Sequence, residues 1–140
     1  MAVYLTLIAS ALGKSGKLGE ALQEIDGSLA AIERTGERFY EAEVYRVKGE
    51  LLLAQDSSIA SQAERSFRTA IEISRKQHAK SWELKATTSL ARLLSDTSRR
   101  DEARAMLAEI YNWFTEGFDT ADLKDAKALL EELGAKNLRG

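Results

Sequence analysis

The sequence contains no cysteine and no proline, and only one of its 140 residues is a histidine. The lack of cysteine excludes disulfides and thiolate metal sites. The lack of proline removes the residue that most strongly interrupts helices. Runs of valine, isoleucine and threonine are also missing, whereas alanine, leucine, glutamate, lysine and arginine, which favour helices, are abundant. These features predict a single all-α domain.

The chain also lacks a long apolar run and a cluster of basic residues. No apolar stretch approaches the roughly 18 residues of a membrane-spanning helix, and the apolar start has no basic residue before it, as a signal peptide would. The 20 basic and 22 acidic residues are intermixed, giving a net charge of −2. Binding to nucleic-acid phosphates needs a clustered basic surface instead. We therefore expect a cytoplasmic protein that binds neither membranes nor nucleic acids.

A pattern of small and large apolar residues occurs three times. In AERSFRTAIEIS, the residues Ala63, Phe67, Ala70 and Ile71 fall on one face of a helix. ALQEIDGSLAAI, from position 21, and ARAMLAEIYNWF, from position 103, repeat this pattern, and each copy follows another patterned segment, LIASAL, VKGELL or SLARLL. A small residue lets the neighbouring helix approach, and a large residue fills the gap beside it. The repeating unit is therefore a helical hairpin, and stacked hairpins bury the apolar face that one hairpin leaves open.

Glycines and capping residues predict where the helices begin and end. We expect helices over residues 2–14, 18–34, 37–55, 59–77, 80–96 and 100–115, followed by a seventh from Asp119 or Thr120 to Gly134. Gly36 is expected to end the second helix, and Asp96 or Ser98 to cap the start of the sixth. The seventh helix carries Leu123, Ala126, Leu130 and Leu133 on one side and charged residues on the other. Such a polar-backed helix is what the open end of a solenoid requires.

The repeated pattern resembles the tetratricopeptide repeat, whose signature combines large residues and Leu-Gly in a first helix with Ala, Phe and Ala in a second. The second hairpin fits it best, through Tyr45, Gly49, Leu52, Ala63, Phe67 and Ala70. The period of 40 to 42 residues is longer than the usual 34, and the closing proline is absent. The resemblance implies a right-handed α-α superhelix with hairpins at about 2–36, 37–79 and 80–116 and a capping helix at about 119–134.

Two segments, GERFYEAEVYRVKGELLL and IYNWFTEGFDTADLKDAKALLEEL, resemble the C-terminal repeat region of large bacterial signalling proteins. In that family a class III adenylate or guanylate cyclase domain, or a DNA-binding domain, precedes an ATPase module and a helical-repeat tail. The resemblance includes no catalytic segment, so no catalytic residue is transferred. It implies that the chain is the C-terminal part of a longer protein. The apolar, uncapped N-terminal helix fits that interpretation, or a homodimer through this face.

No motif predicts an enzyme, a cofactor or a metal site. ALGKSGKL lacks the first glycine of a phosphate loop. His78 has no Cys or Ser partner, and its place near a helix end suits an interaction with the helix dipole. The carboxylate pairs Glu41 with Glu43 and Glu131 with Glu132 point apart on a helix, so we expect them to be solvated.

Four aromatic residues offer an alternative as a recognition site: Trp82, Trp113, Phe114 and Phe118. Core packing is the preferred interpretation, because Trp113 and Phe114 fall where the third repeat meets the seventh helix.

The remaining candidate surface is the inner face of the solenoid. The family resemblance places these residues there: Thr6, Ser10, Lys14, Arg46, Glu50, Lys85, Thr88 and Arg92. A mixed, slightly basic groove suits a peptide with acidic groups, solvation without any partner being the simpler interpretation. We expect a non-catalytic module that binds a protein, a peptide or another domain of the same polypeptide. The alternatives are a small-molecule sensor controlling an attached ATPase or cyclase, and a self-assembly element.

Overall fold

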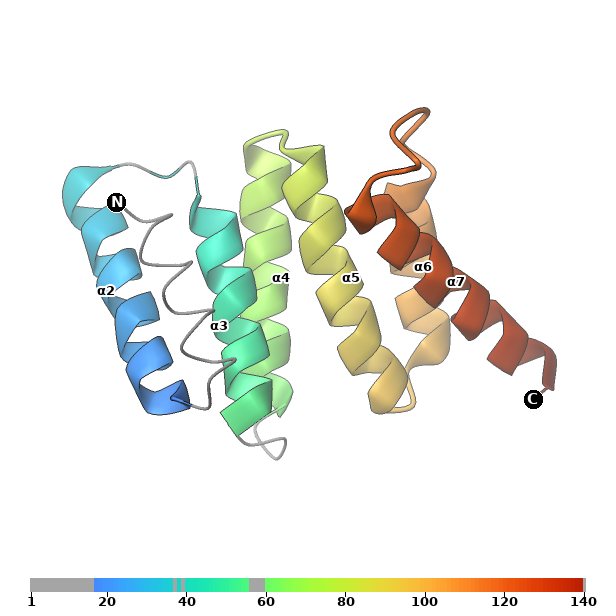
Figure 1. Cartoon of the computed structure of the whole chain (residues 1–140), viewed down its shortest axis with the longest axis horizontal. Coiled ribbons are helices and arrows are strands. Elements are labelled where there is room, and N and C mark those ends of the chain that lie inside the picture. Colours follow the sequence, from blue (N-terminus) through green and yellow to red (C-terminus); the bar gives the residue numbers. More distant parts are fainter. Residues whose placement is uncertain (1–16, 37, 39, 56–59, 140) are drawn as a thin grey trace.

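The computed structural model describes residues 17–36, 38, 40–55 and 60–139, and within them every regular element is an α-helix. The six helices, shown in Figure 1, are α2 (Leu18–Thr35), α3 (Glu41–Gln55), α4 (Ala60–Lys76), α5 (Lys80–Asp96), α6 (Arg100–Tyr111) and α7 (Ala121–Arg139). The expected all-α class is confirmed for this part of the chain. The helix expected over 2–14 lies outside the described residues.

The helices form a stack of hairpins in which each helix packs against the next along the chain (Figure 1). In addition, α3 contacts α5, and α5 contacts α7. These three helices therefore form a continuous row, called here the inner row. α7 contacts α5 as α5 contacts α3, so it takes the place that the first helix of a further hairpin would occupy.

Close packing between helices follows the repeated pattern of the sequence. The small residues Ala21, Ala63 and Ala103 and the large residues four positions later, Ile25, Phe67 and Leu107, are all fully buried. The tightest approach is between α3 and α4, where a Cβ atom added to Gly49 would lie 2.5 Å from Cε1 of Phe67. The predicted roles of small residues as contact points and of Phe67 as the side chain between them are confirmed.

Several helix ends differ from the prediction. α3 begins at Glu41 instead of 37, and α6 ends at Tyr111 instead of 115, so residues 112–120 form a loop. α7 continues past Gly134 to Arg139, although we expected this glycine to end it. Glycine in a helix costs only about 1 kcal/mol relative to alanine, which is too little to end a helix by itself.

The turns between helices use left-handed backbone conformations. As predicted, Gly36 ends α2, with φ 75°, and its N–H donates to the carbonyl of Ile32 at 2.8 Å. His78 and Ser98 adopt φ values of 55° and 66° in the turns after α4 and α5. Ser98 therefore does not cap α6. The position before α6 is Arg99, without a side-chain cap, so the predicted capping by Asp96 or Ser98 is wrong.

Candidate functional site

The predicted inner-face residues that the structure describes lie on two neighbouring helices of the inner row. Arg46 and Glu50 belong to α3, and Lys85, Thr88 and Arg92 belong to α5. The remaining three, at positions 6, 10 and 14, lie outside the described residues. The prediction that Thr88 is exposed is wrong. Its side chain is buried, and its Oγ1 donates to the carbonyl of Leu84 at 2.8 Å.

Arg46 is held by acidic residues on its own helix. Its Nε and Nη2 donate to the two carboxylate oxygens of Glu43 at 2.6 and 2.8 Å, and Glu50 lies 4.0 Å from Nη1. Burial acts to lower the pKa of Arg46, but hydrogen bonding and the charge of Glu43, with Glu50 and Asp122 adding to it, outweigh burial and raise that pKa.

Glu43 connects α3 to α5. The Nζ of Lys85 lies 3.6 Å from Oε2 of Glu43 and 5.7 Å from the ring centre of Trp82. Trp82 in turn meets Tyr40 edge-on at 6.1 Å. Only 15% of the Glu43 side chain is exposed, so the prediction that this carboxylate is solvated is wrong. Glu43 and Asp122 offset the positive charge that the sequence pattern ascribed to Arg46 and Lys85.

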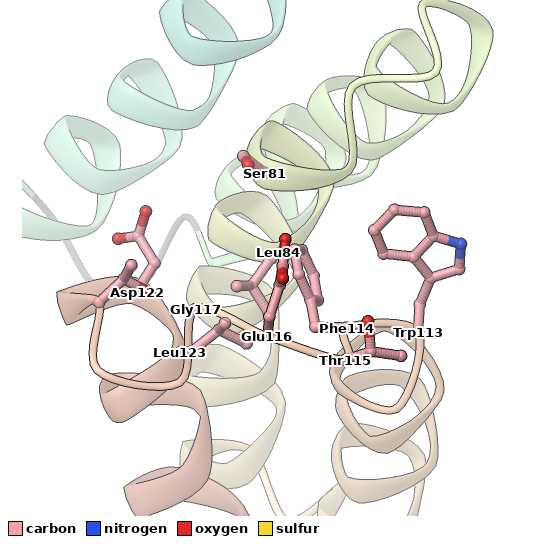
Figure 2. A pocket seen from close by; sticks show the side chains of 10 residues that line it. Ser81, Leu84, Trp113, Phe114, Thr115, Glu116, Gly117, Asp122 and Leu123 are labelled. Carbon is pink, nitrogen blue, oxygen red and sulfur yellow. The ribbon is translucent and has the colours of Figure 1, made fainter.

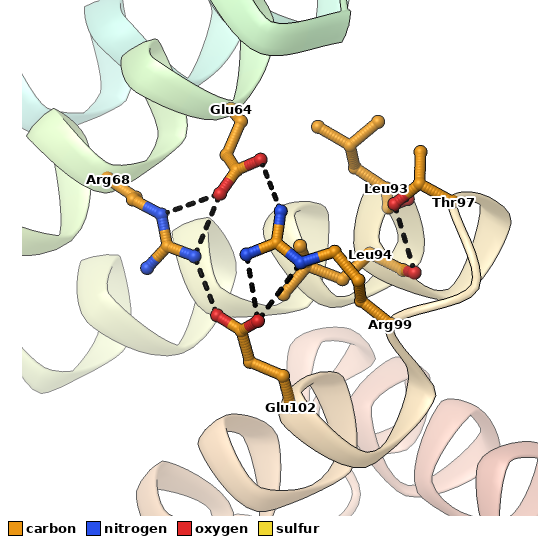
Figure 3. A network of polar contacts seen from close by, with 7 residues as sticks. All are labelled: Glu64, Arg68, Leu93, Leu94, Thr97, Arg99 and Glu102. Atoms are coloured by element: carbon orange, nitrogen blue, oxygen red, sulfur yellow. Dashed lines mark hydrogen bonds and ion pairs between the residues drawn. The ribbon is translucent and has the colours of Figure 1, made fainter.

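A second polar cluster ties α6 to α4, two helices that do not belong to the inner row (Figure 3). We call it the outer ion-pair ring: Glu64, Arg68, Arg99 and Glu102. Arg68 and Arg99 each donate to both carboxylates, at distances between 2.8 and 3.1 Å. Hydrogen bonds from Arg68 and then Arg99 lower the pKa of Glu102. Because every carboxylate oxygen in the ring accepts a bond, the cluster fits a structural clamp better than an acid–base site.

The aromatic residues at the end of the third hairpin divide into two kinds. Phe114 is half-buried and packs against the core, as predicted. Trp113 and Phe118 are 57% and 44% exposed, so core packing is wrong for these two. The reason is the early end of α6, which leaves both residues in the loop 112–120. Trp82 is half-buried beside Lys85.

A pocket of about 450 Å³ opens beside this loop (Figure 2). Leu84 of α5, Leu123 of α7 and Phe114 supply its apolar lining, while Trp113, Glu116 and Asp122 supply aromatic and acidic groups. In Figure 2, Asp122 and Trp113 stand on opposite sides of Leu84 and Phe114. We call this cavity the loop pocket. Periodicity did not predict it, since it depends on where α6 ends.

Within the described part of the chain, no group of three or more histidine, aspartate or glutamate side chains could hold a metal ion. None of the helices described there is long and apolar enough to cross a membrane. No family model matches the chain, and no curated protein is significantly similar to it.

Proposed function

We propose that this chain is a non-catalytic interaction module of the tetratricopeptide-like, right-handed superhelical type. Its binding surface is the exposed side of the inner row. The supporting observation is the packing of α3 on α5 and of α5 on α7, which places three separate helices along one surface. A solenoid uses such a surface to bind an extended or helical segment of a partner.

Side chains from α3 and α5 meet on this surface, where Glu43 bonds both Arg46 of its own helix and Lys85 of α5. From α7, the negative charge of Asp122 contributes to the raised pKa of Arg46. A partner lying across the row would contact several helices at once and would find both signs of charge. On such a mixed surface, complementary charges contribute more to the specificity of partner binding than to its affinity.

The resemblance to bacterial signalling proteins suggests two partners. One is another domain of the same polypeptide, and the other is a separate cytoplasmic protein. In either case the module would act by holding or releasing an attached enzyme. We propose this regulatory role for the inner row, with no chemistry of its own.

Two exposed arginines provide a matched test of this proposal. Arg92 lies on α5 of the inner row, and Arg104 lies on α6, which is outside it. Arg92→Glu should lower the recovery of specific partners in quantitative affinity capture from the source cell, whereas Arg104→Glu should leave it unchanged. Circular dichroism of both variants checks that they remain folded. Equal recovery with both variants would rule out the inner row as the binding surface.

A further inference from the structure

The loop pocket is formed by a segment rich in acidic residues, whereas the rest of the inner row carries both signs of charge. Residues 112–122 include three acidic residues, Glu116, Asp119 and Asp122, and no basic residue. Glu116 and Asp122 line the pocket beside the apolar side chains of Leu84, Phe114 and Leu123. A cavity of about 450 Å³ is within the size range of specific ligand pockets.

Trp113 gives this acidic pocket an exposed aromatic wall. Its ring is edge-on to Phe114, with the ring centres 5.1 Å apart, and more than half of it is open to solvent. Lys80 already places its ammonium group 5.5 Å from the centre of the Trp113 ring. An aromatic face next to carboxylates attracts cations through the ring quadrupole and through charge. The Lys80 contact shows that this ring accepts a cation within the protein's own fold.

We propose that the loop pocket binds an arginine or lysine side chain of a partner peptide. This inference rests on the proposed interaction function and specifies the class of partner. The cationic head lies against Trp113 on the side of Glu116, and Asp122, beyond Leu84 and Phe114, adds to the negative charge of the pocket. The aliphatic stem and a neighbouring apolar residue of the peptide cover Leu84, Phe114 and Leu123, as amphipathic side chains do when they bury their stems. The charge pattern selects against an acidic partner at this end of the row.

The test uses short peptides as probes and the Trp113 indole N–H as a reporter in ¹⁵N NMR spectra. The probe is acetyl-Gly-Leu-Arg-Leu-Gly-amide, and its matched controls replace arginine with glutamine or glutamate. Titration extends to about 10 mM, tenfold above a millimolar Kd. We expect saturable shifts of the Trp113 indole and of residues 115–122 with the arginine peptide, and weaker or no binding with the controls. No shift at the highest concentration, or equal binding of all three peptides, would overturn the proposal.

Substitutions at three exposed or half-exposed positions separate the contributions of the aromatic ring, the carboxylate and the competing ammonium group to peptide binding. Trp113→Ala should weaken binding of the arginine peptide about fivefold, by removing the cation–π contact, with backbone shifts of residues 115–122 as the readout. Glu116→Gln should weaken binding about threefold, whereas Glu109→Gln, an exposed site on α6, should not change it. Lys80→Ala should leave binding unchanged or stronger, because a competing cation is lost. Weaker binding of the arginine peptide to Lys80→Ala would contradict the proposal, because it would mean that Lys80 does not compete with the peptide for the Trp113 ring.

Two further outcomes are informative. If the Trp113 signal shifts with protein concentration in the absence of peptide, a second copy of the chain occupies the pocket and the proposal is wrong. If the peptides do not bind but Arg92→Glu still reduces partner capture, the pocket assignment fails and the proposed function stands. If the arginine peptide binds the pocket but Arg92→Glu has no effect, the inner row is wrong as the wider binding surface.

Discussion

Substitution of Gly49 by alanine tests the packing on which the whole stack depends. The added Cβ would lie 2.5, 2.7 and 2.9 Å from three ring carbons of Phe67. Real Cβ atoms do not approach ring carbons so closely, and a fully buried aromatic ring cannot bend away as the end of a flexible side chain can. Helix α3 or α4 must therefore move, or the Phe67 ring must leave its preferred rotamer.

The expected magnitude is a balance of two effects. Replacing glycine by alanine inside a helix favours folding by about 1 kcal/mol. Overpacking of a well-filled core costs typically about 1–3 kcal/mol, and three close ring atoms place this site in the upper half of that range. Gly49→Ala should therefore lower the free energy of unfolding by about 1–2 kcal/mol.

Gly27 in α2 provides a matched control, because a Cβ added there meets nothing within 4 Å. Gly27→Ala should raise the free energy of unfolding by about 0.5–1 kcal/mol. Both values follow from urea unfolding monitored by far-ultraviolet circular dichroism, with the slope m compared to verify that the same surface unfolds. If Gly49→Ala stabilises the protein as much as Gly27→Ala, the close approach of α3 to Phe67 is wrong.

A double-mutant cycle identifies the cause of the destabilisation. Phe67→Leu should be destabilising by itself, since it leaves a cavity in the core. In that background the added methyl group gains room, so Gly49→Ala should become neutral or stabilising. Additive effects of the two substitutions would refute the steric explanation.

Three other predictions concern the turns and the ion pairs. Ser98→Gly and His78→Gly should each raise the free energy of unfolding by up to about 1 kcal/mol, because glycine removes the steric cost of a left-handed backbone; urea unfolding measures this. The pKa of Glu102 is lower in the folded chain than its ordinary value. Its contribution to stability is therefore complete above the ordinary carboxyl pKa and declines as the pH falls through the lowered, folded value. Glu102→Gln should make thermal stability less dependent on pH in this acidic window. Glu43→Gln should cost about 1–2 kcal/mol, because it leaves the largely buried Arg46 without its closest charge partner.

The controls for these predictions come from the same helices. Ser95→Gly, at a helical position near the end of α5, should be destabilising, which distinguishes a left-handed site from a general effect of glycine. Glu72→Gln, exposed on α4, should alter neither the acid response nor the stability measurably. A loss of stability in Ser98→Gly, an unchanged acid response in Glu102→Gln, or a neutral Glu43→Gln would each contradict its prediction.

In the described part of the chain, the periodicity of apolar residues was sufficient to predict the helices and their contact residues. Apolar positions such as Ala63 and Phe67 repeat at helical spacing in the sequence, and the core of the structure consists of these same positions. The end of α6 was not predictable in the same way. Trp113 and Phe114 continue the apolar pattern of the helix, yet only Phe114 reaches the core, and nothing local in the sequence distinguishes them.

The inner row was predicted in outline but not in its charge. The resemblance placed Arg46 and Lys85 on one surface, and the structure brings both to Glu43. That contact joins positions 42 residues apart (85 minus 43), so it depends on how α3 and α5 pack rather than on any local pattern. Thr88 was predicted to be exposed, but the structure buries its side chain, because that side of α5 packs against its neighbours.

The outer ion-pair ring has a consequence for the shape of the molecule. Among the described residues, α4 and α6 are joined through these side chains and not by direct packing of their backbones, whereas the inner row is held by helix contacts. Exposed ion pairs weaken as salt screens them, and apolar contacts do not. We therefore expect the side that carries the outer ion-pair ring to deform more easily than the inner row. We expect the curvature of the stack of helices, measured by small-angle scattering, to change with ionic strength while its helix content stays constant.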